Sequence, residues 1–229
     1  MKIWLKAFLF FVMVSGQSVF AGSSGGVTIG GTRLIYDGDR KEASLSVTNS
    51  DTIPYLIQSW TETREGGAEK APFIITPPLF RLDSNQSNVL RVVRTGGALP
   101  EDRESLYWLN VKSIPSSLLQ NKSTNTLQLA VKSQIKLIYR PASLTGKPDQ
   151  QTEKLRWQIS GSKITVTNPT PFVMNFKQVT IGNKEVKDAT YVLPMSQTTF
   201  SVPAGATGRV SWKLITDYGG IGPQHTSEY

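Results

Sequence analysis

Apolar and polar residues alternate over short segments along most of the chain after residue 26, which is the pattern of β-strands with one buried face. These segments are rich in Val, Ile, Thr and aromatic residues and are bounded by turn-forming residues. In the first half of the chain they lie at 27–37, 42–49, 54–60, 72–76, 88–94, 105–112 and 124–141. Strands at spacings of roughly 10 to 20 residues predict an immunoglobulin-like β-sandwich.

The pattern changes after Pro141. Residues 142–154 are polar and predict a linker or a long loop. Strand patterns then resume at 155–160, 163–168, 172–181, 190–193, 198–202 and 208–215. We therefore expect an all-β protein of two tandem immunoglobulin-like β-sandwich domains, residues 22–141 and 142–229.

The last strand of the first domain, residues 124–141, is much longer than the usual strand of about five or six residues. Leu127, Leu129 and Val131 lie two apart in it, so their side chains share one face. On alternation alone, the simpler interpretation is that these three side chains pack in the core of their own domain. The other interpretation is β-augmentation, in which an exposed strand pairs with a partner protein and offers alternating apolar side chains to its groove.

The first 21 residues predict a secretory signal peptide. Lys2 and Lys6 precede an apolar run at 7–14, and small residues suited to cleavage end at about Ala21. No later stretch is apolar for long enough to form a transmembrane helix, so we expect an exported chain without membrane insertion. Because residues 1–21 contain two lysines and no acid, their removal lowers the formal charge from +8 to +6. The remaining basic residues are scattered, so no nucleic-acid partner is expected.

Few residues suited to catalysis or metal binding are present. The chain has no cysteine, which excludes disulfides and thiolate metal sites. Its single histidine, His225, lies in a polar C-terminal tail that we expect to be mobile. Motifs for a serine nucleophile, a zinc-binding helix, a phosphate loop or a dinucleotide site are absent from the sequence. We expect no enzymatic activity, no cofactor and no metal.

Two cations belong to strands that can be neighbours in a sandwich. Arg33 lies in the first strand and Lys136 in the last strand of the first domain. If both faced a cleft between the domains, they would repel each other unless an anion such as a carboxylate were bound between them. Taken alone, the two residues are more simply interpreted as solvated surface charges.

Several segments are informative in combination. They are TRLIYDG (32–38), LSVTN (45–49), PYLIQSW (54–60), TPPLFRL (76–82), LPEDRESLYWLNVKSIP (99–115), LQLAVKSQIKLIYRP (127–141), VTNPTPF (166–172) and DYGG (217–220). Together they resemble the periplasmic pilus (fimbrial) assembly chaperone family, over about residues 27–220. The loop at 116–126 is of moderate length, which resembles the branch of the family with a short loop before the last strand.

The resemblance implies two immunoglobulin-like domains in a boomerang arrangement. It implies a periplasmic chaperone that binds pilus subunits lacking their final strand and delivers them to an outer-membrane usher. In this family the chaperone lends its own strand to the subunit, which is donor-strand complementation. Leu127, Leu129 and Val131 match the side chains that fill the groove of the subunit.

The resemblance also implies a carboxylate anchor. Arg33 and Lys136 match the pair that holds the C-terminal carboxylate of the subunit, and Thr32 is a helper beside Arg33. Strict alternation places Lys136 on the face opposite to Leu127. We therefore expect a bulge or the twist of the strand to redirect one of them.

Two further sets of residues are structural or peripheral in the resemblance. Glu104, Arg140 and Asp217 match a charge network between the domains. A surface that contacts the usher is implied for Pro54, Leu56, Ile114 and Pro115. Because the chain continues after DYGG with a polar segment, we expect the second domain to lack its last strand or to end irregularly.

The alternative function is a secreted two-domain immunoglobulin-like adhesin or ligand-binding module. This alternative places Leu127, Leu129 and Val131 in the core of their own domain. The sequence leaves open whether a chaperone of this kind self-associates when it carries no subunit.

Overall fold

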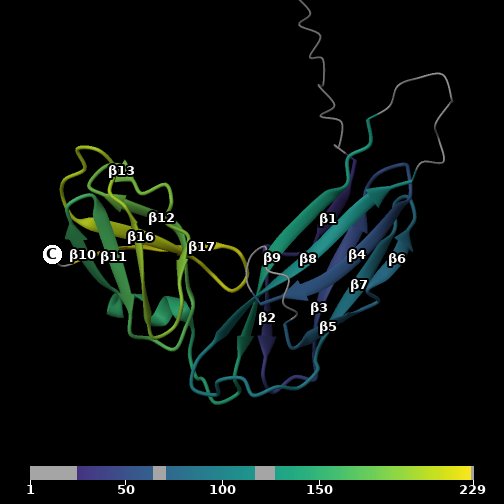
Figure 1. The fold of residues 1–229 in the computed structure, drawn as a ribbon, viewed down its shortest axis with the longest axis horizontal. Coiled ribbons are helices and arrows are strands. Elements are labelled where there is room, and N and C mark those ends of the chain that lie inside the picture. The colour runs from purple at the N-terminus through teal and green to yellow at the C-terminus, as the bar shows by residue number, and fades with distance from the viewer. Residues whose placement is uncertain (1–24, 64–70, 117–126, 228–229) are drawn as a thin grey trace, which may run out of the picture.

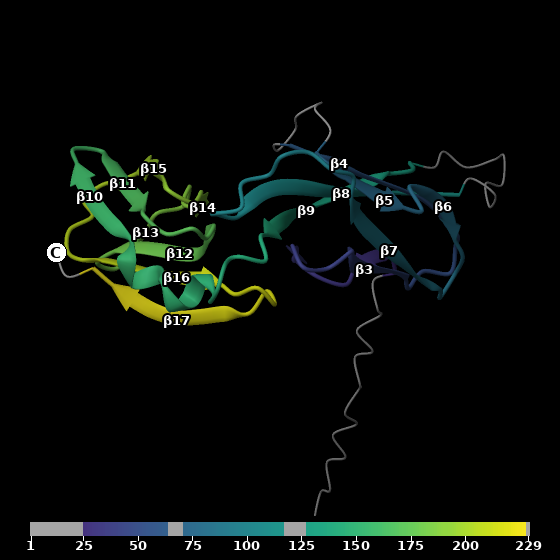
Figure 2. The same ribbon diagram turned by 90° about the horizontal axis from the view of Figure 1, so that it is seen from below.

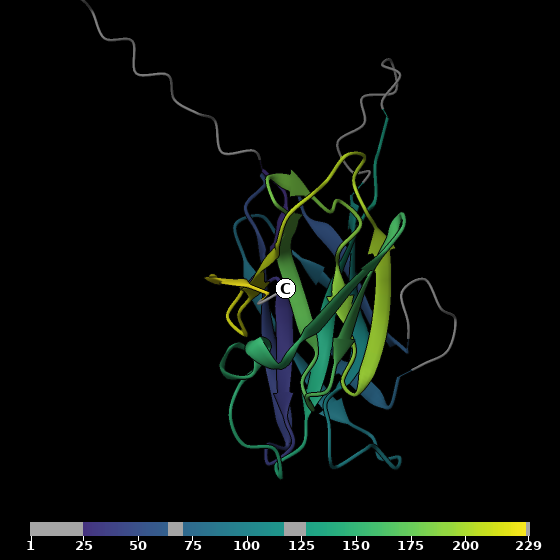
Figure 3. The same cartoon turned by 90° about the vertical axis from the view of Figure 1, so that its left-hand side faces the viewer.

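The computed structural model describes residues 25–63, 71–116 and 127–227, and it confirms an all-β protein of two β-sandwiches (Figure 1). The N-terminal sandwich contains β1 to β9 and the C-terminal sandwich contains β10 to β17. The two are set at an angle to each other, as Figures 1 and 2 show from perpendicular directions. Seen from the side of the C-terminal sandwich, they lie one behind the other (Figure 3). Within the described ranges, no helix has the length and apolar character needed to cross a membrane.

The N-terminal sandwich consists of two sheets. The first has the order β1 (Val27–Ile29), β3 (Glu42–Asn49), β7 (Ser87–Arg94) and β5 (Phe73–Thr76), all antiparallel. The second has the order β2 (Arg33–Asp37), β9 (Val131–Arg140), β8 (Ser105–Pro115), β4 (Tyr55–Glu62) and β6 (Leu79–Leu82). In the second sheet β2 and β9 are parallel, and the other neighbours are antiparallel.

The segment 27–37, predicted as one strand, is two strands in different sheets. β1 pairs with β3, and β2 pairs with β9. The break occurs at Gly30 and Gly31, where the backbone comes so close to β3 that a Cβ on Gly30 would collide with Ser46 Oγ. The Gly30 amide donates a hydrogen bond to the Ser46 carbonyl oxygen at 2.9 Å. The crossing brings β2 alongside β9 in the other sheet.

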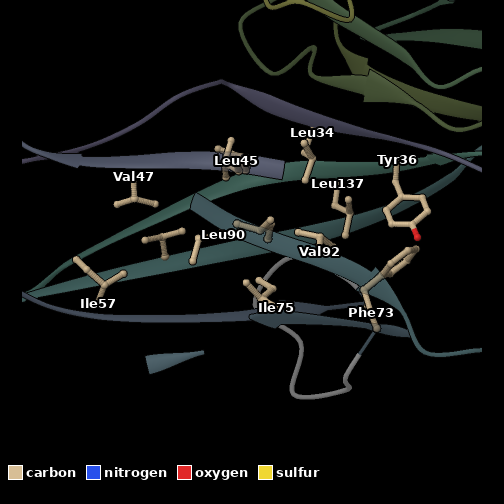
Figure 4. Close-up of a cluster of buried hydrophobic side chains, with 14 of the residues drawn as sticks. Leu34, Tyr36, Leu45, Val47, Ile57, Phe73, Ile75, Leu90, Val92 and Leu137 are labelled. Atoms are coloured by element: carbon tan, nitrogen blue, oxygen red, sulfur yellow. The ribbon is translucent and has the colours of Figure 1, made fainter. Parts of the chain in front are cut away.

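Buried apolar side chains from both sheets fill the N-terminal sandwich (Figure 4). They come from alternate positions of the strands, as the pattern predicts. Fully buried examples are Val47, Ile57, Leu90, Val92, Leu109 and Leu137. At one end Tyr36 packs against Phe73, with ring centroids 5.3 Å apart, and the Tyr36 hydroxyl donates to the Lys41 carbonyl oxygen at 2.8 Å. This core anchors β9 through its C-terminal half.

The C-terminal sandwich also has two sheets. One has the order β10 (Arg156–Ser160), β11 (Lys163–Asn168) and β15 (Ser196–Ser201). The other has the order β13 (Lys184–Glu185), β12 (Met174–Ile181), β16 (Val210–Ile215) and β17 (Ile221–Thr226), with β14 (Tyr191–Val192) also paired to β12. The polar stretch before it contains two short 3-10 turns, η1 (Pro148–Gln150) and η2 (Thr152–Lys154).

The expectation that the second domain ends without its last strand is wrong. β17 pairs antiparallel with β16, and His225, predicted to lie in a mobile tail, stacks on Trp212 with centroids 5.9 Å apart. The segment is polar because β17 is an edge strand with one neighbour, where Pro223 also costs no hydrogen bond to a second strand. Strand pairing depends on the backbone, so a polar edge strand leaves little hydrophobic pattern in the sequence. The two-residue edge strand β13 was missed for the same reason, and β6, which is apolar, was missed because it has only four residues.

Candidate functional site: an open strand edge and the interdomain cleft

β9 has an unpaired edge along its N-terminal half. It pairs with β8 from Val131 to Tyr139, but with β2 only from Lys136 onward. Between Val131 and Ile135, the part of the chain that the structure describes supplies β8 on one side and no strand on the other. An edge of this kind presents unpaired backbone groups to another chain.

The residues before β9 continue this edge without strand structure. The long strand predicted at 124–141 is regular only over β9, residues 127–130 have no strand partner, and 124–126 lie outside the described residues. The exposed fractions of Leu127, Leu129 and Val131 are 85%, 68% and 57%. In Figure 1 the teal segment that leads into β9 runs beyond the end of the sheet. The interpretation that these three side chains pack in their own core is therefore wrong.

No bulge separates these apolar side chains from Lys136. The register between β8 and β9 runs without a shift from Ser105 opposite Tyr139 to Ser113 opposite Val131. Ile135, Leu137 and Tyr139 point into the core, so Val131 lies on the core face and Lys136 on the other face. The expectation that a bulge redirects one of these side chains is wrong. Leu127 and Lys136 need not share a face, because one face of β9 continues the core and the other faces the interdomain cleft.

Arg33 and Lys136 are direct neighbours in the parallel pair of β2 and β9. Arg33 is buried, with 9% of its surface exposed, and its Nη1 donates to the Ile215 carbonyl oxygen at 3.3 Å across the domain boundary. Its Nε is buried and makes no hydrogen bond within the described ranges. Burial lowers the pKa of the Arg33 guanidinium, and the charge of Asp217 partly offsets this effect. Arg33 is thus no solvated surface charge.

Lys136 reaches across the boundary from the other direction. Its Nζ donates to Asn175 Oδ1 at 2.6 Å and lies 4.3 Å from the centre of the Tyr191 ring. The Trp108 ring lies 5.9 Å away. Asn175 and Tyr191 belong to the C-terminal sandwich, so they hold the ammonium group at the junction of the two domains.

The two cations line a cleft of about 440 Å³ between the sandwiches. Its wall consists of Thr32, Arg33, Trp108, Gln134, Ile135, Lys136, Lys177, Ile215, Gly219 and Ile221. Thr32 thus lines the cleft beside Arg33, as the resemblance implies. Lys177 was not among the predicted site residues, because nothing in the sequence around it sets it apart from the other exposed lysines. With three cations and no carboxylate among these lining residues, the cleft is suited to an anion.

A charge network links the domains behind this cleft. Arg140 Nε donates to Glu104 Oε1 at 2.7 Å, and its two terminal nitrogens donate to Asp217 at 2.8 and 3.0 Å. Glu104 Oε2 accepts the Val173 amide at 2.7 Å, which ties it to the C-terminal sandwich. The structure therefore brings together all three residues that the resemblance assigns to this network.

Burial and charge pairing have opposing effects on the pKa values of the network. Desolvation by itself lowers the pKa of Arg140, but the hydrogen bonds and charges of Asp217 and Glu104 outweigh it and raise that pKa. The side chain of Glu104 is 0% exposed, and desolvation raises its pKa despite Arg140 and the Val173 amide. Through these contacts the network joins the two sandwiches at the back of the cleft.

The four residues implied for the usher surface lie together on adjacent strands. Leu56 on β4 faces Ile114 on β8, and the next pair joins Tyr55 with Pro115. The Pro54 carbonyl oxygen accepts the Ser116 amide at 3.0 Å just beyond the strand end. Leu56 is 42% exposed, so part of this apolar surface is available to a partner.

Both sandwiches match a described family. Residues 26–145 match "Pili and flagellar-assembly chaperone, PapD N-terminal domain", and residues 150–226 match "Pili assembly chaperone PapD, C-terminal domain". The chain is 42% identical over 217 residues to the protein named "Chaperone protein FimC" of Escherichia coli K12, covering 94% of this chain and 87% of that protein.

Two solved structures resemble the fold over nearly their full length. One is the SafB chaperone of Salmonella enterica in complex with the SafA pilin, with a TM-score of 0.83, 40% identity, and coverage of 88% of this chain and 95% of that chain. The other is described as the periplasmic chaperone SfaE, with a TM-score of 0.75, 39% identity, and coverage of 88% and 99%.

Proposed function

This chain belongs to the pili assembly chaperone family and is a chaperone for fimbrial subunits, and from that premise we propose that it holds a subunit by donor-strand complementation along β9. The subunit-binding segment is residues 127–135, and the cleft at Arg33 and Lys136 receives the end of the subunit chain. The function is a binding function without catalysis, since the relatives are named as chaperones.

The observation that carries this proposal is the open edge of β9. An unpaired edge invites aggregation, and proteins normally cover or charge such edges. Here the edge continues into a segment in which Leu127, Leu129 and Val131 are all more than half exposed. A subunit that lacks one strand has an open edge and an apolar groove of its own, so the two open surfaces complement each other.

The same geometry opposes the adhesin alternative. A ligand-binding module would bury Leu127, Leu129 and Val131 in its own sandwich, but these side chains extend away from it. A strand that pairs with a partner gains backbone hydrogen bonds along the edge. Its three apolar side chains contribute about 1.5 to 3 kcal/mol each when fully buried, before entropic costs.

The cleft sets the register of the bound subunit. The buried Arg33 offers a planar fork of donors, and Lys136 offers a compact charge directly beside it. A C-terminal carboxylate bound by both groups, with the Thr32 hydroxyl as a further donor, marks where the subunit strand ends. Without such a mark, a strand paired along an alternating edge is free to slip by two residues.

The network of Glu104, Arg140 and Asp217 is the structural support of this anchor. It keeps the C-terminal sandwich in place, so that Asn175 reaches Lys136 across the cleft. A change in the angle between the domains would separate the anchor from its supporting groups.

Delivery to an outer-membrane usher is part of the proposal. The apolar surface of Pro54, Leu56, Ile114 and Pro115, in which Leu56 is exposed and the other three are partly buried, is the contact for the usher. A second copy of the chain covers the same open edge when no subunit is bound, because an uncovered edge is prone to pair with any available strand.

The site of action is the periplasm. The relative SfaE is described as a periplasmic chaperone. The signal peptide expected at residues 1–21 agrees with export, and it lies outside the described residues.

The test is capture of subunits from the periplasm. The tagged chain is expressed with the fimbrial genes of its host, and the proteins that co-purify are identified by mass spectrometry. We expect the wild-type chain to retain pilus subunits and Lys136→Ala to lose them. The matched control is Lys163→Ala, which removes an exposed lysine from β11 in the other domain.

Arg33→Ala is the second variant. Because Arg33 is buried and contacts Ile215, the folding of this variant is checked by circular dichroism and thermal unfolding before subunit capture is measured. Normal capture by a folded Lys136→Ala variant would refute the carboxylate anchor. Protection of the amides of residues 127–130, which have no strand partner, from hydrogen exchange in the free monomer would refute the open edge.

A further inference from the structure

The C-terminal sandwich contributes a cation of its own to the cleft. Lys177 on β12 lines the same 440 Å³ space as Arg33 and Lys136. It is exposed, and within the described ranges its side chain makes no hydrogen bond or ion pair. Its ammonium group is therefore available to a ligand in the cleft.

A break in strand register accompanies this placement. β12 pairs with β16 through Phe176 opposite Leu214 and then Gln178 opposite Lys213, so Lys177 has no partner residue on β16. Phe176 points into the domain core, and Asn175 and Lys177 on either side of it point the other way, toward the cleft. Irregularities of this kind often redirect side chains at functional sites.

The charges around the cleft do not balance with one bound carboxylate. Arg140 is paired with Glu104 and Asp217, and Asp217 also acts on Arg33. These two carboxylates offset Arg140 and one of the three cleft cations. Two positive charges remain, and the C-terminal carboxylate of a subunit neutralises one of them.

We propose that the cleft recognises a subunit whose last residue carries a second acid, an Asp or Glu side chain, and that Lys177 is the group that binds it. This inference rests on the carboxylate anchor of the proposed function and adds the ligand's terminal residue to it. Arg33 and Lys136 hold the main-chain carboxylate, and Lys177 faces the terminal side chain from the opposite wall. Lys177 is thus a specificity-determining residue of the site.

The expected preference is moderate and sensitive to salt. An ion pair with an exposed lysine strengthens binding by about three- to fivefold. At about 0.5 M NaCl, salt screening reduces this preference for an acidic last residue, because the Debye length is well below that at physiological ionic strength. The main-chain carboxylate depends less on salt because Arg33 is buried.

Synthetic peptides test the inference with the full chain. The probes are eight-residue peptides of alternating Val and Thr that end in Tyr-Glu or Tyr-Gln, each with a free or an amidated C-terminus. Binding is followed by tryptophan fluorescence, to which Trp108 in the wall of the cleft contributes, with calorimetry as a second measurement. The proteins are the wild-type chain, Lys177→Gln, Lys136→Gln and the control Lys163→Gln.

We expect the wild-type chain and Lys163→Gln to bind the free-acid Glu peptide about three- to fivefold more tightly than the free-acid Gln peptide. Lys177→Gln removes this difference and keeps the preference for a free C-terminus over an amide. Lys136→Gln weakens both free-acid peptides.

The peptide affinities distinguish the role of Lys177 from the carboxylate anchor itself. If the wild-type chain prefers free over amidated termini but treats Glu and Gln alike, the role of Lys177 is refuted and the carboxylate anchor stands. If Lys177→Gln still binds the Glu peptide more tightly than the Gln peptide, the role of Lys177 is refuted as well. If amidation changes nothing, or no peptide binds, the anchor itself is refuted and this inference with it.

Discussion

Truncation of the exposed apolar side chains just before β9 and at its first residue tests the central feature of this chaperone. In the series Leu127→Ala, Leu129→Ala and Val131→Ala, each variant removes one side chain proposed to enter the subunit groove. We expect weaker binding of subunits together with an unchanged stability of the free chain. Truncation of side chains in the core would instead lower the stability of the free chain, so the two measurements together distinguish donor-strand residues from core residues.

The magnitude follows from the exposure of each side chain. Full burial of a leucine contributes about 1.5 to 3 kcal/mol, and Leu129 is 68% exposed, so its transfer into a groove contributes about 1 to 2 kcal/mol. Its truncation should raise the Kd for the subunit about 5- to 30-fold. Leu127, which is 85% exposed, should have the larger effect, and the smaller Val131, which is 57% exposed, the smallest. The free energy of unfolding of the free chain should change by no more than about 0.5 kcal/mol.

Competition inside the cell measures the ratio of the Kd values of the variant and the wild-type chain for the subunit. Each tagged variant is expressed together with a differently tagged wild-type chain, and the limiting subunit recovered on each tag is quantified by mass spectrometry. Leu193→Ala is the control, since it truncates a leucine that is 42% exposed in the C-terminal sandwich. Urea unfolding of the purified variants gives the stability.

Two outcomes would refute the reasoning. The first is that all three variants compete for the subunit as well as Leu193→Ala does. The second is a loss of stability of about 2 kcal/mol or more in the free variants, which is the size expected for truncation of buried side chains.

Two further predictions concern the charge network between the domains. Arg140→Ala should lower the free energy of unfolding by about 3 to 5 kcal/mol, because it leaves the fully buried carboxylate of Glu104 without its partner. The control Arg103→Ala removes an exposed ion pair with Asp102 and should leave urea unfolding unchanged. Equal effects of the two variants would contradict the role of the network. Burial raises the pKa of Glu104 above its ordinary value of 4.5, so the folded chain binds this proton more tightly than the unfolded chain does. The stability of the wild type relative to Glu104→Gln should therefore be greatest below pH 4.5 and fall as pH rises through the raised pKa. Urea unfolding of both proteins from pH 4 to pH 8 measures this stability difference, and a difference that grows with pH would refute the prediction.

Much of the fold was predictable because local pattern reports burial. Alternation identified β3 and β11 at their observed bounds and placed most other strands within a few residues. One cause of the failures is that pairing along an edge leaves little hydrophobic signal. The polar β17 is stabilised by hydrogen bonds to β16 and by His225 on Trp212, and neither contact is visible in a linear pattern.

The candidate site divides in the same way. The sequence by itself determined the two all-β domains and the periodicity that places Leu127, Leu129 and Val131 on one face of a strand and Lys136 on the other. Its motifs, through resemblance, also indicated which residues to expect in the proposed anchor and in the network. These properties follow from residue type and spacing along the chain.

Only the tertiary structure decided what each face meets. The crossing at Gly30 and Gly31 sets Arg33 beside Lys136. Because β2 begins only at Arg33, the edge of β9 before Lys136 is left open. The angle between the sandwiches creates the cleft, and Lys177 lines it from β12, more than 40 residues away from Lys136 in sequence. Exposure and charge balance depend on which segments lie close together in space, and the spacing of residues along one strand does not contain that information.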